Sequence, residues 1–168
     1  RERYGRGARV VPRIPPASPR YSIGHRTAGR SALIDYQDDL HGITPDRVVG
    51  FWVGWPAPPT QEMHLRIMQG SEAVVLAIDP EADGRVVGFV TAIGDGVLAA
   101  SIPLLEVLPA YQGQGIGSQL VRRMLAKLND RYMVDLVCDE DVVPFYERLG
   151  LTPYRAMIVR RAAVLRRF

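Results

Sequence analysis

Hydrophobic and polar positions change their period along the chain, and these changes predict where strands and helices lie. Strand-like runs, apolar and rich in β-branched or aromatic residues, cover residues 21–26, 73–78, 85–93, 97–108, 132–138 and 154–160. Apolar residues recur at helical spacing in residues 31–40, 60–68, 117–128 and 142–149. Asp83-Gly84 and Asp95-Gly96 are turn signals between strands. Strands first, followed by strand–helix–strand–helix–strand, predict a mixed α/β sheet.

Local signals add detail at four places. Thr44 precedes Pro45, which predicts a short helix with Thr44 as its N-cap. Asp141 is predicted to cap the helix over 142–149, and Gly150 to end it. The aromatic and proline-rich residues 51–59 are predicted to form a structured loop.

A glycine-rich run lies between the strand-like residues 102–109 and the helix that continues from Ser118. It reads Gln112-Gly113-Gln114-Gly115-Ile116-Gly117. A helix N-terminus binds anions, because its first N–H groups lack partners and the helix dipole is positive there. Glycine lets a ligand approach the backbone and permits positive φ. We therefore expect the run to bind a pyrophosphate; a glycine turn without a ligand is the alternative.

Three phosphate-binding patterns compete for this run. A dinucleotide-binding turn needs Gly-x-Gly-x-x-Gly, but its third glycine position is Ser118 here. A P-loop needs a Lys after its last Gly, and none follows. Gln/Arg-x-x-Gly-x-Gly/Ala fits at every defined position. With Val107-Leu108-Pro109 and Tyr111 before it, the run resembles the acetyl-CoA motif of the GNAT superfamily of N-acetyltransferases.

A second segment, residues 139–151, supports the resemblance. Its Phe145-Tyr146-Glu147-Arg148-Leu149-Gly150 core is similar to the family's pattern, whereas Asp139 replaces the usual Asn and Val142 the usual Ala. The change at Asp139 puts a side-chain contact to CoA from this position in doubt. The resemblance covers about residues 20–160 and implies a GNAT fold, a mostly antiparallel twisted sheet flanked by helices.

The resemblance also implies where acetyl-CoA would bind. The family's sheet carries a bulge and splays open at the strand edge that corresponds to residues 106–108, beside the strand over 132–138, and pantetheine amides pair with this edge. The residues implied to contact CoA are Val107, Leu108, Gln112, Gly113, Gln114, Gly115, Ile116, Gly117, Ser118, Asp139 and Phe145.

Tyr146 is by resemblance the donor that protonates the departing thiolate; a purely packing role is the alternative. The family's upstream strand base is missing, because the corresponding stretch is Ser101-Ile102-Pro103. Glu106 is the nearest acid and could act through water or serve only as a surface or ion-paired residue; Asp135 and Glu140 are further options. An amine that arrives neutral, or that loses its proton along a water chain, needs no such base. Cys138 is expected to be a small buried hydrophobe rather than an acyl carrier.

The acyl acceptor is expected to meet residues 33–68, since this part lies over the sheet in the family. Phe51, Trp52 and Trp55 could line an amine pocket through cation–π contacts, or they could anchor a core loop. Aspartates 35, 38 and 39 could supply counter-charge.

Charge is distributed unevenly along the 168 residues, whose formal net charge is +3. Residues 1–30 hold eight Arg and one Glu, residues 155–168 hold five Arg, and residues 31–154 carry a net charge of −9. The basic ends could touch nucleic acid, but a solvated arm over residues 1–20 is the more common use of such a sequence. The acidic body suits a cationic amine.

The remaining features limit the function classes. We expect one domain over residues 21–168 and no membrane segment or signal peptide. The single cysteine, Cys138, fits a reducing cytoplasm. His25, His41 and His64 lack metal-ligand spacing, so no metal is expected. The sequence predicts an N-acetyltransferase acting on a small-molecule or peptide amine; a non-catalytic acyl-CoA sensor is the alternative, and a homodimer stays open.

Overall fold

The computed structural model describes residues 33–55, 57–159 and 164. The regular strands and α-helices, in chain order, are β1 Asp35–Gln37, α1 Gln61–Gln69, β2 Ala73–Asp79, β3 Arg85–Gly94, β4 Ala99–Val107, α2 Ile116–Lys127, β5 Met133–Asp135 and α3 Val143–Glu147. Short 3₁₀ turns occur at Pro45–Arg47, Pro109–Tyr111 and Glu140–Val142. The predictions over 1–32, including the strand at 21–26 and the arm at 1–20, lie outside the described residues.

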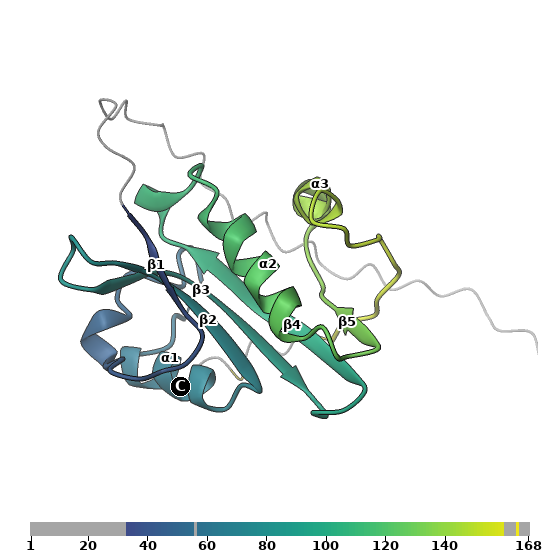
Figure 1. Cartoon of the computed structure of the whole chain (residues 1–168), viewed down its shortest axis with the longest axis horizontal. Helices are drawn as coiled ribbons and strands as arrows, with labels where there is room; N and C mark the ends of the chain where they lie inside the picture. Colours follow the sequence, from purple (N-terminus) through teal and green to yellow (C-terminus); the bar gives the residue numbers. More distant parts are fainter. Residues whose placement is uncertain (1–32, 56, 160–163, 165–168) are drawn as a thin grey trace, which may run out of the picture.

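The strands form one sheet in the order β1-β2-β3-β4-β5 (Figure 1). The first four strands are antiparallel, and β5 joins β4 in parallel. The β4–β5 pairing spans only Ala99–Ser101 against Met133–Asp135, so β4 extends beyond its partner. This confirms the predicted mixed sheet that opens beside β4.

The bulge, however, does not lie at residues 106–108. Val107 and Glu106 pair regularly with β3, and the register shifts between Leu104 and Ser101, where β4 has one extra residue. Pro103 lies in this stretch and has no N–H to give to a ladder, which explains the irregularity there.

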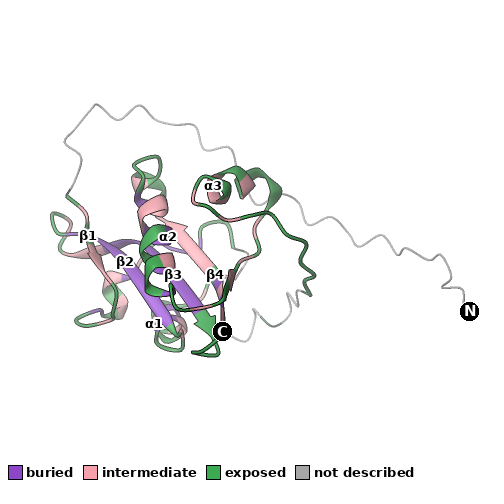
Figure 2. Cartoon of the chain, turned by 45° about the vertical axis from the view of Figure 1, so that its right-hand side comes forward, coloured by how far each residue is buried: buried purple, intermediate pink, exposed green. Residues whose placement is uncertain are grey.

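Helices α1 and α2 cover opposite faces of the sheet. A Cβ at Gly88 would contact Leu120 of α2, whereas the next residue, Phe89, stacks its ring against His64 of α1. Successive strand residues point to opposite faces, so the two helices lie on different sides. All seven residues of β2 are consequently buried, and Figure 2 shows this buried centre in purple.

The predicted helix over 31–40 is wrong in its described part, where residues 35–37 form β1. Ile34 and Tyr36 are half-buried at a spacing of two, the period of a strand at the edge of a sheet. Lys127 of α2 donates to the carboxylate of Asp38 at 3.0 Å and holds this edge in place. The pairing of this segment with β2 therefore outweighs the helical spacing of its apolar residues.

The predicted strand at 154–160 is also absent from its described residues, 154–159. Tyr154 and Met157 are 98% and 101% exposed, because no neighbouring strand pairs with them among the described residues. Two helix caps differ as well. Thr44 makes no capping bond, and Asp141 lies inside a 3₁₀ turn that precedes α3, with Val142 at the N-cap position. The helix predicted over 60–68 forms as α1, with Thr60 as its N-cap. The described residues of the 51–59 loop contain no helix or strand, as the sequence predicts.

Candidate active site

The glycine run forms a tight turn at the start of α2. Gly113 and Gly115 have φ of 75° and 81°, a conformation that L side chains rarely adopt. The first helical bond runs from Gln119 N to Gly115 O at 3.0 Å, so the N–H groups before it have no helical acceptor. A Cβ at Gly115 would meet no protein atom within 4 Å. The turn thus presents bare backbone to open space.

A pocket of about 290 Å³ lies at this turn. It is lined by Val107, Tyr111, Gln112, Gly113, Gly115, Ile116, Gly117, Ser118 and Phe145. A Cβ at Gly117 would lie 3.7 Å from both Phe145 and Val107, so the start of α2 lies between α3 and the end of β4. The structure therefore brings the two sequence motifs together. Three residues predicted for CoA are not in this lining: Leu108, Gln114 and Asp139.

Polar side chains around the turn brace its backbone. Gln112 donates to the carbonyl of Val107 at 2.9 Å, and Gln114 donates to that of Ala110 at 3.3 Å. Tyr111 donates its hydroxyl proton to the buried carboxylate of Asp79 at 2.7 Å. Sequence reasoning missed Asp79, because its partner lies 32 residues away. These contacts involve side chains and carbonyl groups, and the N–H groups at the start of α2 stay without a helical acceptor.

Leu108 and Asp139 have other surroundings. Leu108 is buried in the core and donates its N–H to the carbonyl of Val87 at 2.9 Å. Asp139 is exposed, and its carbonyl accepts from Val142 N at 3.2 Å. Its side chain makes no capping bond.

Tyr146 lies beside the pocket, with its ring centroid 4.8 Å from that of Phe145. Burial, and secondarily the nearby Cys138, raise the pKa of its phenol. The phenol therefore stays protonated at neutral pH. Burial, with smaller contributions from Asp139 and Asp141, also raises the pKa of the Cys138 thiol. Cys138 is half-buried and stays protonated, which is the opposite of an activated nucleophile.

Glu106 faces the other side of the sheet from Val107, its neighbour in β4. Its carboxylate accepts hydrogen bonds from Trp52 N at 2.9 Å and Val53 N at 3.2 Å. Trp52 has a φ of 67°, which is uncommon for a residue with a side chain. Glu106 therefore holds a strained turn of the 51–59 loop through two charge-assisted bonds.

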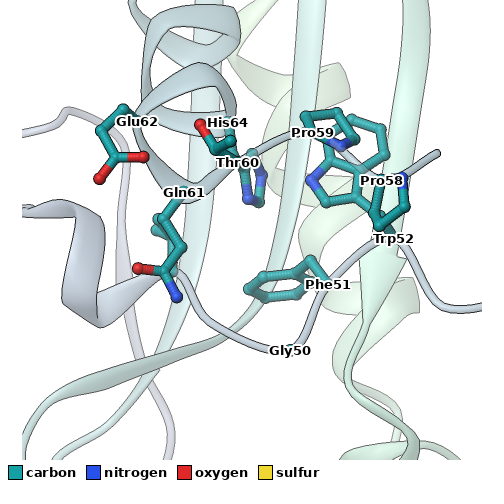
Figure 3. A pocket seen from close by; sticks show the side chains of 10 residues that line it. Gly50, Phe51, Trp52, Pro58, Pro59, Thr60, Gln61, Glu62 and His64 are labelled. Carbon is teal, nitrogen blue, oxygen red and sulfur yellow. The ribbon is translucent and has the colours of Figure 1, made fainter. Parts of the chain in front are cut away.

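Beneath this loop lies a second pocket, of about 420 Å³, on the α1 side of the sheet (Figure 3). It is lined by Val48, Gly50, Phe51, Trp52, Pro58, Pro59, Thr60, Gln61, Glu62 and His64. Phe51 and Trp52 are buried there, while Trp55 is 43% exposed and packs on Trp52 at 5.0 Å between ring centroids. The two alternatives for these aromatic residues, anchoring a core loop and lining a pocket, are thus compatible, because Phe51 and Trp52 are buried and also line the pocket.

His64 is the residue of this pocket that sequence reasoning set aside. It is 1% exposed and packs against Phe89, Trp52 and Phe51 at ring-centroid distances of 4.5, 5.1 and 5.2 Å. Burial lowers its pKa to about 4, so the imidazole is neutral at pH 7. A His at the fifth position of the predicted helix over 60–68 was the available signal.

Neither pocket has the chemistry of a metal centre. Within residues 33–55 and 57–159, no cluster of three His, Cys, Asp or Glu side chains could hold a metal ion. The helices of the same part of the chain are all too short or too polar to cross a bilayer.

Known proteins share this sequence and fold. A provisionally named acetyltransferase from Deinococcus radiodurans R1 is 53% identical, with 82% of this chain and 95% of that chain covered and a TM-score of 0.77. The uncharacterized N-acetyltransferase ycf52 of Pyropia yezoensis is 28% identical over 100 residues, 58% of each protein. Serotonin N-acetyltransferase 2 of Oryza sativa subsp. japonica is 36% identical over 97 residues, which cover 55% of this chain and 48% of that protein.

The chain thus spans about half the length of these two curated relatives. The model of the acetyltransferase (GNAT) family matches residues 17–151, which include both motifs and every strand of the sheet. With the splayed sheet, the glycine turn at the start of α2 and the family match in agreement, the chain belongs to the GNAT family of acetyltransferases.

Proposed function

We propose that this protein transfers an acetyl group from acetyl-CoA to a primary amine by direct attack. The observation that carries the proposal is the pocket in which the glycine turn of α2 meets Val107 and Phe145. Bare N–H groups at a helix start suit a pyrophosphate, and a pocket that continues to Phe145 brings the ligand toward Tyr146.

The edge of β4 beyond Ser101 suits the pantetheine arm. Residues 104–107 of β4 pair with β3 on one side, and on the other side β4 extends past the end of β5. Amides of a bound chain pair with such an edge as an added strand does. This arrangement directs the thioester toward the opening between β4 and β5.

The chemistry requires a neutral amine, whose nitrogen forms a bond to the thioester carbonyl carbon while the carbon–sulfur bond breaks. The amine nitrogen loses one proton, and the departing thiolate gains one from Tyr146. The raised pKa of Tyr146 keeps the phenol protonated at neutral pH, so that the proton is present when the thiolate departs. The bonds of Glu106 to Trp52 and Val53 support a positioning task for this residue more than a base task.

The acceptor class rests on charge and on the relatives. Residues 31–154 carry a net charge of −9, which attracts a cationic amine. The Oryza sativa relative is named for the acetylation of serotonin, which is a primary amine. A small molecule and a peptide amine both fit these observations.

A panel of primary amines, mixed with acetyl-CoA and assayed for thiol release, tests the proposal. We expect at least one amine to be acetylated, with a mass gain of about 42 units, and one free CoA thiol to appear for each acetylated amine. Acetyl-CoA that binds in calorimetry but is never consumed by any amine would favour the sensor alternative.

A further inference from the structure

The pocket on the α1 face contains polar atoms that are buried without partners. Both ring nitrogens of His64 and the indole nitrogen of Trp52 lack a hydrogen bond among the described residues. A buried polar group without a partner costs about 1–3 kcal/mol. A purely apolar core would fill the same space with a phenylalanine and avoid this cost. The unpaired atoms therefore point to a ligand that pairs with them.

The protonation state of His64 limits what that ligand can be. The neutral ring has one N–H donor and one bare nitrogen that accepts. The backbone of Val48 partly offsets the effect of burial on the pKa of the ring, although neither ring nitrogen forms a hydrogen bond with it. The acceptor of the neutral His64 ring and the indole donor of Trp52 are therefore both without a partner among the described residues. A hydroxyl group matches this pair, because it donates and accepts at once.

The walls of the pocket favour a flat apolar body behind that hydroxyl. Phe51 and Trp52 supply aromatic rings, and Pro58 and Pro59 close one side (Figure 3). The imidazole of His64 extends from α1 toward Phe51, next to the indole of Trp52. The volume of about 420 Å³ accommodates one or two fused rings with a short chain.

The two pockets lie back to back across the end of one strand. Glu106 reaches the loop over the α1-side pocket, and the next residue, Val107, lines the pocket at the glycine turn. Beyond Ser101 the outer edge of β4 extends past β5 and pairs with no strand among the described residues. Glu62, exposed at the rim, and Glu106 provide negative charge for an ammonium group.

We propose that this pocket binds the acyl acceptor as a hydroxylated aromatic amine, with its hydroxyl between His64 and Trp52 and its amine directed toward β4. The inference rests on the proposed acetyl transfer, because it names the acceptor of that reaction. His64 and Trp52 are specificity-determining residues in this arrangement, and neither takes part in the chemistry.

Paired probes test the hydroxyl directly. Tyramine and phenethylamine differ by one hydroxyl, and calorimetry on the CoA-saturated protein measures the affinity of each without any turnover. We expect the wild type to bind tyramine about tenfold or more tightly, as a site built for a hydroxyl does. His64→Phe keeps the ring packing and should reduce this preference to about one. Trp55→Phe, on the exposed neighbour, is the matched control and should keep it.

Trp52→Phe provides a second route if His64→Phe does not fold, because it removes the indole donor and should also lower the preference. The proposal is overturned if wild type binds the two amines equally, binds neither, or if His64→Phe retains the full preference. A preserved preference for tyramine without any acetyl transfer would contradict the proposed function and leave the pocket assignment standing.

Discussion

The two faces of the sheet at the end of β4 build their pockets in different ways. On the α2 face, one contiguous stretch supplies a bare backbone turn, braced by its own glutamine side chains. On the α1 face, Trp52, His64 and Glu106 come from three separate segments, and their side chains define the pocket and its loop. The turn on the α2 face is therefore encoded by neighbouring residues. The pocket on the α1 face forms only when the sheet and α1 pack together.

This difference predicts different sensitivities. The backbone site tolerates exchange of side chains that do not enter the turn but not the loss of its glycines. The side-chain site should respond to single chemical groups on distant residues. Variants of either site test this difference, and the largest effect is expected at the glycine turn.

Replacement of Gly115 by Val should have the largest effect. It adds a branched side chain to the open space at the start of α2 and strains a residue at φ 81°. We expect CoA affinity in calorimetry to fall roughly 10³-fold, about 4 kcal/mol. Gly96→Val is the matched control, since Gly96 has φ 74° and an equally open Cβ position but lies in the β3–β4 turn. Equal CoA affinity in a folded Gly115→Val protein would disprove the turn assignment.

The pH dependence of the free energy of unfolding should show that His64 is held neutral in the folded protein. Its folded pKa of about 4 lies below the ordinary value of 6.5, so the unfolded chain binds a proton first. The stabilisation is complete above pH 6.5 and is lost as pH falls to about 4, by up to about 3 kcal/mol. Urea unfolding of His64→Phe should lack this part of the decline. His41→Phe, on an exposed histidine, is the control and should retain it. Identical pH profiles for His64→Phe and wild type would show that His64 is not held neutral.

Tyr146→Phe should reduce turnover rather than binding. The variant keeps the ring beside Phe145 but removes the phenolic proton. With an acceptor in hand, we expect kcat to drop roughly 10²-fold while CoA affinity stays within about twofold. Tyr132→Phe, on a side chain that is 87% exposed, should leave kcat unchanged. Full kcat for Tyr146→Phe from pH 6 to 9 would remove Tyr146 from the chemistry.

Glu106→Gln should have the smallest effect. An amide keeps the shape but has one acceptor oxygen, so it loses one of the two bonds to Trp52 and Val53 and weakens the other, at a cost of about 1–2 kcal/mol. Amide hydrogen exchange at these two residues should accelerate, whereas Glu81→Gln, on an exposed residue, should change neither. A kcat loss far beyond that change, with exchange unaltered, would restore Glu106 as a base.

Several elements could be predicted because their signals are local. The turn at 83–84, the helix capped by Thr60 and the apolar face of α2 depend on residues within a few positions of one another. The β1 segment and residues 154–159 could not be predicted in the same way, because a strand exists only where another strand offers its backbone groups. Tyr36 therefore became part of a strand despite the helical spacing around it, and Tyr154 did not despite its alternating surroundings.

The sequence by itself determined the glycine turn, because positive φ and bare N–H groups follow from the glycines and the helix that begins there. It likewise placed Phe145 and Tyr146 in the second motif. Tertiary structure alone decided that Val107, Gly117 and Phe145 meet, that Glu106 holds Trp52, and that His64 is buried and neutral. The physical reason is the sequence distance over which each interaction acts. Backbone conformation is set by neighbouring residues, whereas burial, desolvation and hydrogen bonding depend on residues that are distant in the sequence and that the fold brings together.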